Sequence, residues 1–333
     1  MESSQFVLAS RPTGMPSSDN FRMVKTVLKE LQENELLLKS WYISVDPYMR
    51  GRMNRAKSYA ASYEVDQPIR GAIVAKVIKS KSKVIVEGDT VVGTLPWASY
   101  SVEKAENLRK VNIQTIPPGY YLGILGMPGI TAFIGMMEIG KPKKGDTVVV
   151  SGAAGAVGIV AGQIAKLQGA RVIGITGSDE KCRLLKEQFG YNETINYKTS
   201  KSIRKELTTL CPDGVDVYFD NVGGEITEAV AANLDFHARI ALCGQISQYN
   251  NTKPYIGYSI LPHLLTRSVM LQGFIVSNYS DRFGEAISQL TQWVNEGKLK
   301  YIETITEGFD KLPEAFLGLF SGNNLGKMMV KVE

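Results

Sequence analysis

The sequence predicts an α/β protein in which a doubly wound parallel sheet of six strands is combined with a smaller domain built mainly of β-strands. Three observations lead to this expectation. Strands and helices alternate from residue 145 onward, a glycine-rich turn joins the first of these strands to its helix, and residues 35–102 contain short strands separated by turn residues. With 333 residues, the chain is long enough for two domains of ordinary size.

The first part of the chain is expected to form a barrel or curled sheet. Turn residues bound four apolar or alternating segments, which predict strands at 35–44, 71–80, 84–95 and 97–102. A helix is predicted at 128–140, because Pro128 suits the first helical position and Gly140 suits the end.

The second part is expected to be a Rossmann domain with strand order 3-2-1-4-5-6. Its strands are predicted at 146–152, 171–177, 193–198, 215–223, 239–247 and 270–277, and the helices between the first five strands at 155–169, 178–190, 202–211 and 224–234.

The end of the chain departs from this alternation. Residues 281–299 carry an apolar helical stripe, and a strand at 301–308, a helix at 311–320 and a strand at 326–332 follow. Because the six-stranded sheet is already complete, we assign these last elements to the first domain. The expected domains are therefore 1–124 with 305–333, and 125–304.

Composition and charge exclude several classes of protein. The 38 basic and 33 acidic residues give a net charge of +5 without long basic blocks, which argues against a nucleic-acid-binding surface. No unbroken apolar run of about 20 residues predicts a membrane span, and the first residues do not resemble a secretory signal. Cys182, Cys211 and Cys243 are too widely spaced for a zinc or disulfide framework, so we expect a cytoplasmic protein.

The segment from Ser151 to Gly158 has the features of a dinucleotide-binding turn. It follows a predicted strand, opens a helix and carries a variant of the G-x-G-x-x-G pattern, in which Gly155 and Gly158 are the spaced glycines. Gly155 would allow the backbone to approach a pyrophosphate, and Gly158 would allow close packing of helix on strand. The alternative is a purely structural glycine turn.

The end of the second Rossmann strand favours NADP over NAD. NAD-binding proteins usually carry an acidic residue there for the ribose 2′-hydroxyl, whereas this strand ends with Ile175, Thr176, Gly177 and Ser178. Asp179 follows, but Ser178 and Asp179 are better placed to cap the next helix. Lys181 is a candidate for binding a 2′-phosphate, the alternative being a solvated surface lysine.

Other candidate residues lie at the C-terminal ends of the later strands, where ligands of open α/β sheets bind. Asn221 is at the end of the fourth strand, Cys243, Gly244 and Gln245 are at the end of the fifth, and Phe274, Ile275 and Val276 are at the end of the sixth. Small residues and backbone amides there suit a flat nicotinamide ring.

With these motifs the chain resembles the zinc-free medium-chain dehydrogenase/reductases, in particular the prostaglandin/leukotriene reductase and NADPH-dependent curcumin reductase group. The resemblance covers nearly the whole chain and includes VDPYMRGRM, MPGITAF, AAGAVG, GSDEK, INYK, FDNVGGE, CGQISQYN, QGFIV and NLGK. It implies that the β-rich domain is GroES-like. It also implies a homodimer.

The resemblance further implies an NADP(H) site. Gly155, Ala156, Val157 and Gly158 would bind the pyrophosphate, and Lys181 and Tyr197 the 2′-phosphate end. The ribose and nicotinamide would be surrounded by Asn221, Cys243, Gly244, Gln245, Ile246, Ser247, Tyr249, Phe274, Ile275, Val276 and Asn324.

The implied activity is NADPH-dependent reduction of the C=C bond of α,β-unsaturated ketones and aldehydes, by hydride transfer to the β-carbon. A tyrosine is the usual hydrogen-bond donor to the carbonyl oxygen, but Thr266 stands where several relatives have one. The candidate catalytic residues are therefore Tyr249, Tyr59, Tyr63 and Tyr48.

Residues 1–120 contain neither cysteine nor histidine, the usual zinc ligands, which argues against a catalytic zinc. Two alternatives to enone reduction remain open at this point. The same fold and cofactor would serve an NADPH:quinone reductase, and an NADPH-binding protein without turnover is a third interpretation.

Overall fold

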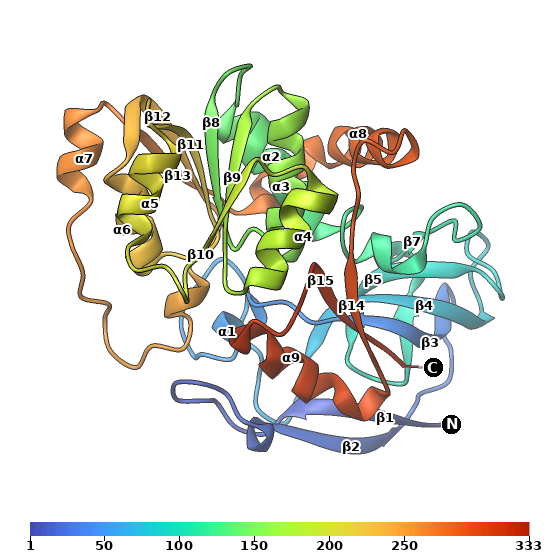
Figure 1. Ribbon diagram of the computed structural model, residues 1–333. Coiled ribbons are helices and arrows are strands. Elements are labelled where there is room, and N and C mark those ends of the chain that lie inside the picture. Colours follow the sequence, from blue (N-terminus) through green and yellow to red (C-terminus); the bar gives the residue numbers. More distant parts are fainter. Residues whose placement is uncertain (333) are drawn as a thin grey trace. The chain divides into compact units, whose positions relative to one another are not determined.

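The computed structural model describes residues 1–332 and divides the chain into two compact units. Unit 1 contains Met1–Leu122 and the C-terminal segment from Glu303, and unit 2 contains Gly123–Ile302. Figure 1 follows the chain through both units in colour. Among the described residues, no helix is long and apolar enough to cross a lipid bilayer.

Unit 2 is built on a parallel sheet of six strands in the order β10-β9-β8-β11-β12-β13. In chain order this is 3-2-1-4-5-6, which confirms the predicted topology. The strands are β8 Thr147–Ser151, β9 Arg171–Thr176, β10 Glu193–Asn196, β11 Val215–Asp220, β12 Leu234–Leu242 and β13 Met270–Gly273.

Helices cover this sheet because each strand is followed by an amphipathic or apolar segment. The helices are α2 Met127–Ile134, α3 Ala156–Leu167, α4 Asp179–Phe189, α5 Ile203–Leu210, α6 Gly224–Ala231, α7 Leu261–Thr266 and α8 Phe283–Asn295. The central strands are buried on both faces, as expected for a parallel sheet. Val149, Ile173, Tyr218 and Ile240 lie in one hydrophobic cluster with residues of α5 and α6.

Unit 1 contains a sheet in the order β14-β15-β3-β4-β5-β7, with β6 also paired to β3, and a separate hairpin of β1 and β2. The β14–β15 pair of this sheet is parallel, and the other pairs of described strands are antiparallel. The elements are β1 Glu2–Leu8, β2 Phe21–Val27, β3 Glu35–Ser44, α1 Met49–Arg52, β4 Arg70–Ser80, β5 Thr90–Pro96, β6 Tyr100–Lys104, β7 Arg109–Lys110, β14 Glu303–Glu307, α9 Leu312–Ser321 and β15 Lys327–Lys331.

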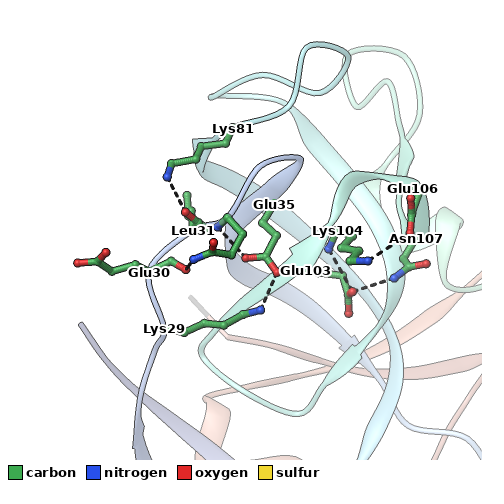
Figure 2. A network of polar contacts seen from close by, with 10 residues as sticks. Lys29, Glu30, Leu31, Glu35, Lys81, Glu103, Lys104, Glu106 and Asn107 are labelled. Carbon is green, nitrogen blue, oxygen red and sulfur yellow. Dashed lines mark hydrogen bonds and ion pairs between the residues drawn. The ribbon is translucent and has the colours of Figure 1, made fainter.

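A polar network at the start of β3 holds the preceding turn against the sheet (Figure 2). The buried carboxylate of Glu35 accepts hydrogen bonds from Lys29 Nζ at 2.6 Å and from the backbone N–H of Gln32 at 2.9 Å. Lys81 Nζ donates to the carbonyl oxygen of Leu31 at 2.5 Å. The Lys29 contact is the main reason that the pKa of Glu35 is lowered. These bonds hold the turn in place at the point where the long strand β3 begins.

The structure corrects several sequence-based boundaries. The expected strand at 84–95 is a strand only from Thr90, because Val84 and Val86 are exposed in a turn. The predicted helix at 128–140 is α-helical to Ile134 and continues as a π-helix over Gly135–Gly140. The fifth Rossmann strand begins at Leu234 instead of residue 239. The β1–β2 hairpin and α7 were not predicted.

Candidate cofactor site and active site

The turn between β8 and α3 is shaped by close backbone packing. Gly155 is the N-cap of α3, and a glycine has no side chain that could cap the helix. A Cβ atom on Gly158 would lie 2.4 Å from the carbonyl oxygen of Gly152 and 2.7 Å from Cα of Ala153, so only glycine fits there. The hydroxyl of Tyr191 donates to the carbonyl oxygen of Gly158 at 2.7 Å and fixes the first turn.

This turn has the properties of an anion-binding site. The first N–H groups of a helix lack intrahelical partners and carry a partial positive charge. Gly155, Ala156 and Val157 are partly exposed, whereas Gly158 is buried. A phosphate group would therefore meet backbone donors at the predicted glycine positions, and the local packing explains why the chain has glycine there.

A second positively charged corner lies beyond the ends of β9 and β10. Ser178 caps α4 by accepting a hydrogen bond from the backbone N–H of Lys181 at 3.3 Å, as the sequence predicted. Burial lowers the pKa of the Lys181 ammonium, and the nearby charge of Lys198 lowers it further. Lys198 was not among the predicted site residues, although it directly follows the predicted Tyr197.

Asp179 and Tyr197 also lie at this corner. Asp179 accepts a hydrogen bond from Nδ2 of Asn196 at 2.7 Å. A Cβ atom on Gly177 would lie 2.9 Å from the hydroxyl of Tyr197, so this ring lies close to the end of β9. Lys181, Lys198 and the Tyr197 hydroxyl thus lie near the ends of β9 and β10, and their donors are of the kind that binds a phosphate group.

Asp220, which the sequence analysis did not single out, organises the turn after β11. This fully buried carboxylate accepts hydrogen bonds from Ser151 Oγ at 3.0 Å, from the Tyr218 hydroxyl at 2.9 Å and from the backbone N–H of Gly223 at 3.0 Å. The predicted Asn221 is held beside it, because its Nδ2 donates to the carbonyl oxygen of Ser151 at 2.8 Å. The signal in the sequence was an acidic residue at the end of the apolar segment Val217–Phe219 of this strand.

The loop after β12 lies against the same turn. The backbone N–H groups of Cys243 and Gly244 donate to the carbonyl oxygen of Asp220 at 2.8 and 3.0 Å. Ser247 Oγ donates to the carbonyl oxygen of Val222 at 2.6 Å. The structure therefore brings the predicted loop residues Cys243, Gly244, Gln245, Ile246 and Ser247 next to Asn221. Burial raises the pKa of the Cys243 thiol to about 12, so this thiol is neutral.

Tyr249 folds back over this loop. Its hydroxyl oxygen accepts a hydrogen bond from the backbone N–H of Gln245 at 3.4 Å and lies 3.1 Å from the position of a Cβ atom on Gly244. After β13, Phe274 is buried and packs edge-on against Phe219, while Ile275 and Val276 are half-buried. All of these residues belong to unit 2.

The remaining predicted residues lie in unit 1. The hydroxyl of Tyr63 donates to the carbonyl oxygen of Arg70 at 2.7 Å, and the guanidinium of Arg52 lies over its ring at 4.2 Å from the centroid. Tyr48 packs against the hydrophobic core, and Tyr59 is exposed. Nδ2 of Asn324 donates to the carbonyl oxygen of Gly326 at 3.0 Å.

The same two-unit organisation is found in known proteins. Residues 4–111 match the family described as "N-terminal domain of oxidoreductase", and residues 156–292 match the one described as "Zinc-binding dehydrogenase". The putative NADP-dependent oxidoreductase YfmJ of Bacillus subtilis is 50% identical over 330 residues, which cover 98% of this chain and 97% of that protein. The chain belongs to the zinc-free medium-chain dehydrogenase/reductases.

Two further relatives of this zinc-free family match the whole chain. The NADP(+)-dependent 2-alkenal reductase of Nicotiana tabacum is 40% identical over 333 residues, covering 98% of this chain and 97% of that protein. The crystal structure of CurA from Vibrio vulnificus in complex with NADPH superposes with a TM-score of 0.94 at 41% identity, covering 99% of both chains.

The zinc named in one family description does not fit the residues of this medium-chain dehydrogenase/reductase. Within residues 1–332, no three His, Cys, Asp or Glu side chains are grouped so that they could hold a metal ion. The three cysteines, Cys182, Cys211 and Cys243, are all free thiols. The nicotinamide cofactor does fit, because the α3 N-terminus and the lysine corner supply donors for its phosphate groups.

Proposed function

We propose that the protein reduces the C=C bond of α,β-unsaturated ketones and aldehydes with NADPH, by hydride transfer to the β-carbon. The observation that carries the cofactor part is the pair of lysines near the ends of β9 and β10, Lys181 on α4 and Lys198 after β10. Lys181 is half-buried and Lys198 is exposed, and the positive charge of Lys198 disfavours the charged form of Lys181; a 2′-phosphate dianion would offset this repulsion. NADPH supplies the hydride when it is bound.

We assign the cofactor contacts as follows. The turn at Gly155–Gly158 holds the pyrophosphate, and Lys181, Tyr197 and Lys198 hold the 2′-phosphate. The ribose and nicotinamide meet Asn221, the 243–249 loop, Phe274, Ile275 and Val276, with Asn324 as a further contact. Support comes from the exposure of the Gly155–Val157 backbone and from the hydrogen bonds of Asp220, which draw Asn221 and the 243–249 loop together.

The lack of the usual metal ligands in residues 1–120 supports reduction of an alkene over direct reduction of a carbonyl group. Residues 1–120 contain no cysteine or histidine, so the usual protein ligands for a metal that would polarise a carbonyl are missing there. A conjugated enone instead spreads the incoming negative charge onto its oxygen, where a neutral hydrogen-bond donor stabilises it. The activity in the name of the tobacco relative, 2-alkenal reduction, belongs to the same substrate class.

Tyr249 is our first candidate for this donor. It belongs to the loop that contacts the Asn221 turn, and its hydroxyl can donate a hydrogen bond to an oxygen. Tyr63 is a weaker candidate, because its hydroxyl already donates to Arg70. Tyr48 and Tyr59 remain as alternatives.

Product analysis tests the proposal. The purified protein should oxidise NADPH with a simple enone such as a linear 3-alken-2-one and yield the saturated ketone. An allylic alcohol would refute C=C reduction. Turnover of quinones in the absence of any enone turnover would favour a quinone reductase, and NADPH binding without oxidation by either class would favour a non-catalytic protein.

We also propose that two copies pair along β13 to form a homodimer. Among the described strands, β13 is an edge of the six-stranded sheet, where a further strand could pair. Large exposed apolar side chains surround it, including Phe236, Leu265, Met270 and Leu271. Light scattering after size-exclusion chromatography should give twice the chain mass, and Leu271→Lys should shift it toward the monomer. The free thiols support action in a reducing compartment such as the cytoplasm.

A further inference from the structure

Unit 1 contains a buried ion pair that no step of the proposed reaction uses. Lys327 Nζ lies 3.1 Å from Oδ1 of Asp46, and the two side chains are 2% and 7% exposed. The same ammonium donates to the carbonyl oxygens of Val45 at 2.8 Å and Met328 at 2.6 Å. All three N–H donors of the Lys327 ammonium group are therefore used, by two backbone carbonyl oxygens and one carboxylate.

The pair joins the two parts of the chain that make up unit 1. Lys327 is the first residue of β15, which pairs with β3, and Asp46 lies two residues after the end of β3. The other carboxylate oxygen of Asp46 accepts a hydrogen bond from the hydroxyl of Ser44. Both oxygens of Asp46 are thus fixed at the point where the chain leaves the sheet.

Asp46 also starts the segment that carries the tyrosine candidates of unit 1. Its carbonyl oxygen accepts a hydrogen bond from the backbone N–H of Met49 at 3.1 Å, which opens α1. Two arginines of α1 also donate hydrogen bonds to the backbone outside this helix. Arg50 donates to the carbonyl oxygen of Gly14 at 2.8 Å, and Arg52 donates to that of Ala61 at 2.8 Å.

We propose that Lys327 and Asp46 are positioning residues that hold the 46–63 segment, with Tyr48 and Tyr59, in the conformation needed to receive the substrate. The substrate role of this segment rests on the proposed function. A buried ion pair adds little net stability compared with apolar residues of similar size, whereas it fixes a unique geometry. The ion pair lies just after the end of β3, at the start of the 46–63 segment, so its geometry sets the conformation of that segment.

The test uses Asp46→Asn, which keeps the size of the side chain and an oxygen for the Ser44 hydroxyl but removes the charge. Amide hydrogen exchange should become at least tenfold faster within 46–63 while the β3–β4 core remains protected. The enone kcat/KM should fall at least tenfold, with the dissociation constant of NADPH within twofold of wild type. Lys331→Met is the matched control, because it breaks the exposed 3.2 Å pair with Glu307 on β14 and β15.

A double variant, Asp46→Asn with Lys327→Met, separates positioning from stability. Removing both charges should restore the melting temperature toward wild type, while the exchange rate in 46–63 and kcat/KM remain altered. Recovery of kcat/KM together with the melting temperature would assign the pair a stabilising role only and overturn the proposal. Unchanged exchange in Asp46→Asn would also overturn it. If the wild-type protein reduces no enone, the proposed function fails, and the exchange experiment alone still decides whether the pair orders the segment.

Discussion

Replacing Lys181 with alanine should weaken NADPH binding selectively. The ammonium is half-buried, and both its burial and Lys198 lower its pKa, so a nearby phosphate would stabilise its charged form. A charge-assisted hydrogen bond to a phosphate oxygen contributes about 1.5–3 kcal/mol. Loss of this contact should raise the dissociation constant of NADPH by about tenfold to 150-fold. NADH has no 2′-phosphate, so its dissociation constant should change less than about twofold.

Fluorescence titration of the two reduced cofactors measures both constants directly. Lys186→Ala is a suitable control because it removes a positive charge from the same helix. Lys186 Nζ lies 3.6 Å from Oε2 of Glu193 in an exposed ion pair. This control should bind both cofactors as wild type does. Equal weakening of NADPH and NADH by Lys181→Ala, or an equal effect of Lys186→Ala, would refute the assignment of the 2′-phosphate site.

Three further predictions concern the proposed hydrogen-bond donor, the half-buried carboxyl group of Glu303 and the glycine turn before α3. Tyr249→Phe should lower the enone kcat by about 10²–10³ if the hydroxyl is preorganised, with unchanged NADPH affinity in a titration; full activity would exclude Tyr249. Burial raises the pKa of Glu303 to about 7 from its ordinary 4.5, so the stability contributed by the protonated form is present below pH 4.5 and lost as the pH rises through 7. In urea unfolding, the free energy of unfolding of Glu303→Gln should not show this decrease with pH, which is about 1–2 kcal/mol after solvent screening. The same decrease between pH 4.5 and pH 7 in wild type and variant would contradict the prediction. Gly158→Ala should cost about 1–3 kcal/mol in the same assay, whereas Gly284→Ala, whose Cβ would meet no described atom within 4 Å, should cost nothing; equal effects would contradict the packing argument.

The topology of unit 2 could be predicted because each of its elements has a strong local signal. Buried parallel strands are continuous apolar runs, and the helices between them have polar faces and caps such as Ser178. The start of β12 was missed for a physical reason. Phe236 is exposed there and His237 has a φ of 60°, so this stretch has neither the burial nor the backbone regularity of a typical strand.

Long-range hydrogen bonding explains what could not be predicted in the site. Asp220 gathers donors from Ser151, which lies 69 residues earlier, and from its own turn, so its role depends on the fold and not on local spacing. Lys198 approaches Lys181 only because β10 lies beside β9 in the sheet. The β1–β2 hairpin was missed because the adjacent residues Arg22 and Met23 of β2 are both exposed, as is Lys25, so β2 has no clear alternation of buried and exposed residues.

Thr266 bears directly on where the catalytic donor lies. The resemblance places it where several relatives are expected to have a tyrosine, and its hydroxyl donates to the carbonyl oxygen of Pro262 at 2.7 Å within α7. Donating to a substrate would require breaking this bond, and the side chain is far shorter than a tyrosine. We therefore expect the proposed donor to be a residue other than Thr266. Tyr249 meets this need within unit 2, because its loop is hydrogen-bonded through Cys243 to the turn that holds Asn221. A donor there keeps its distance to the strand ends that we assign to the nicotinamide, whatever conformation the 46–63 segment adopts.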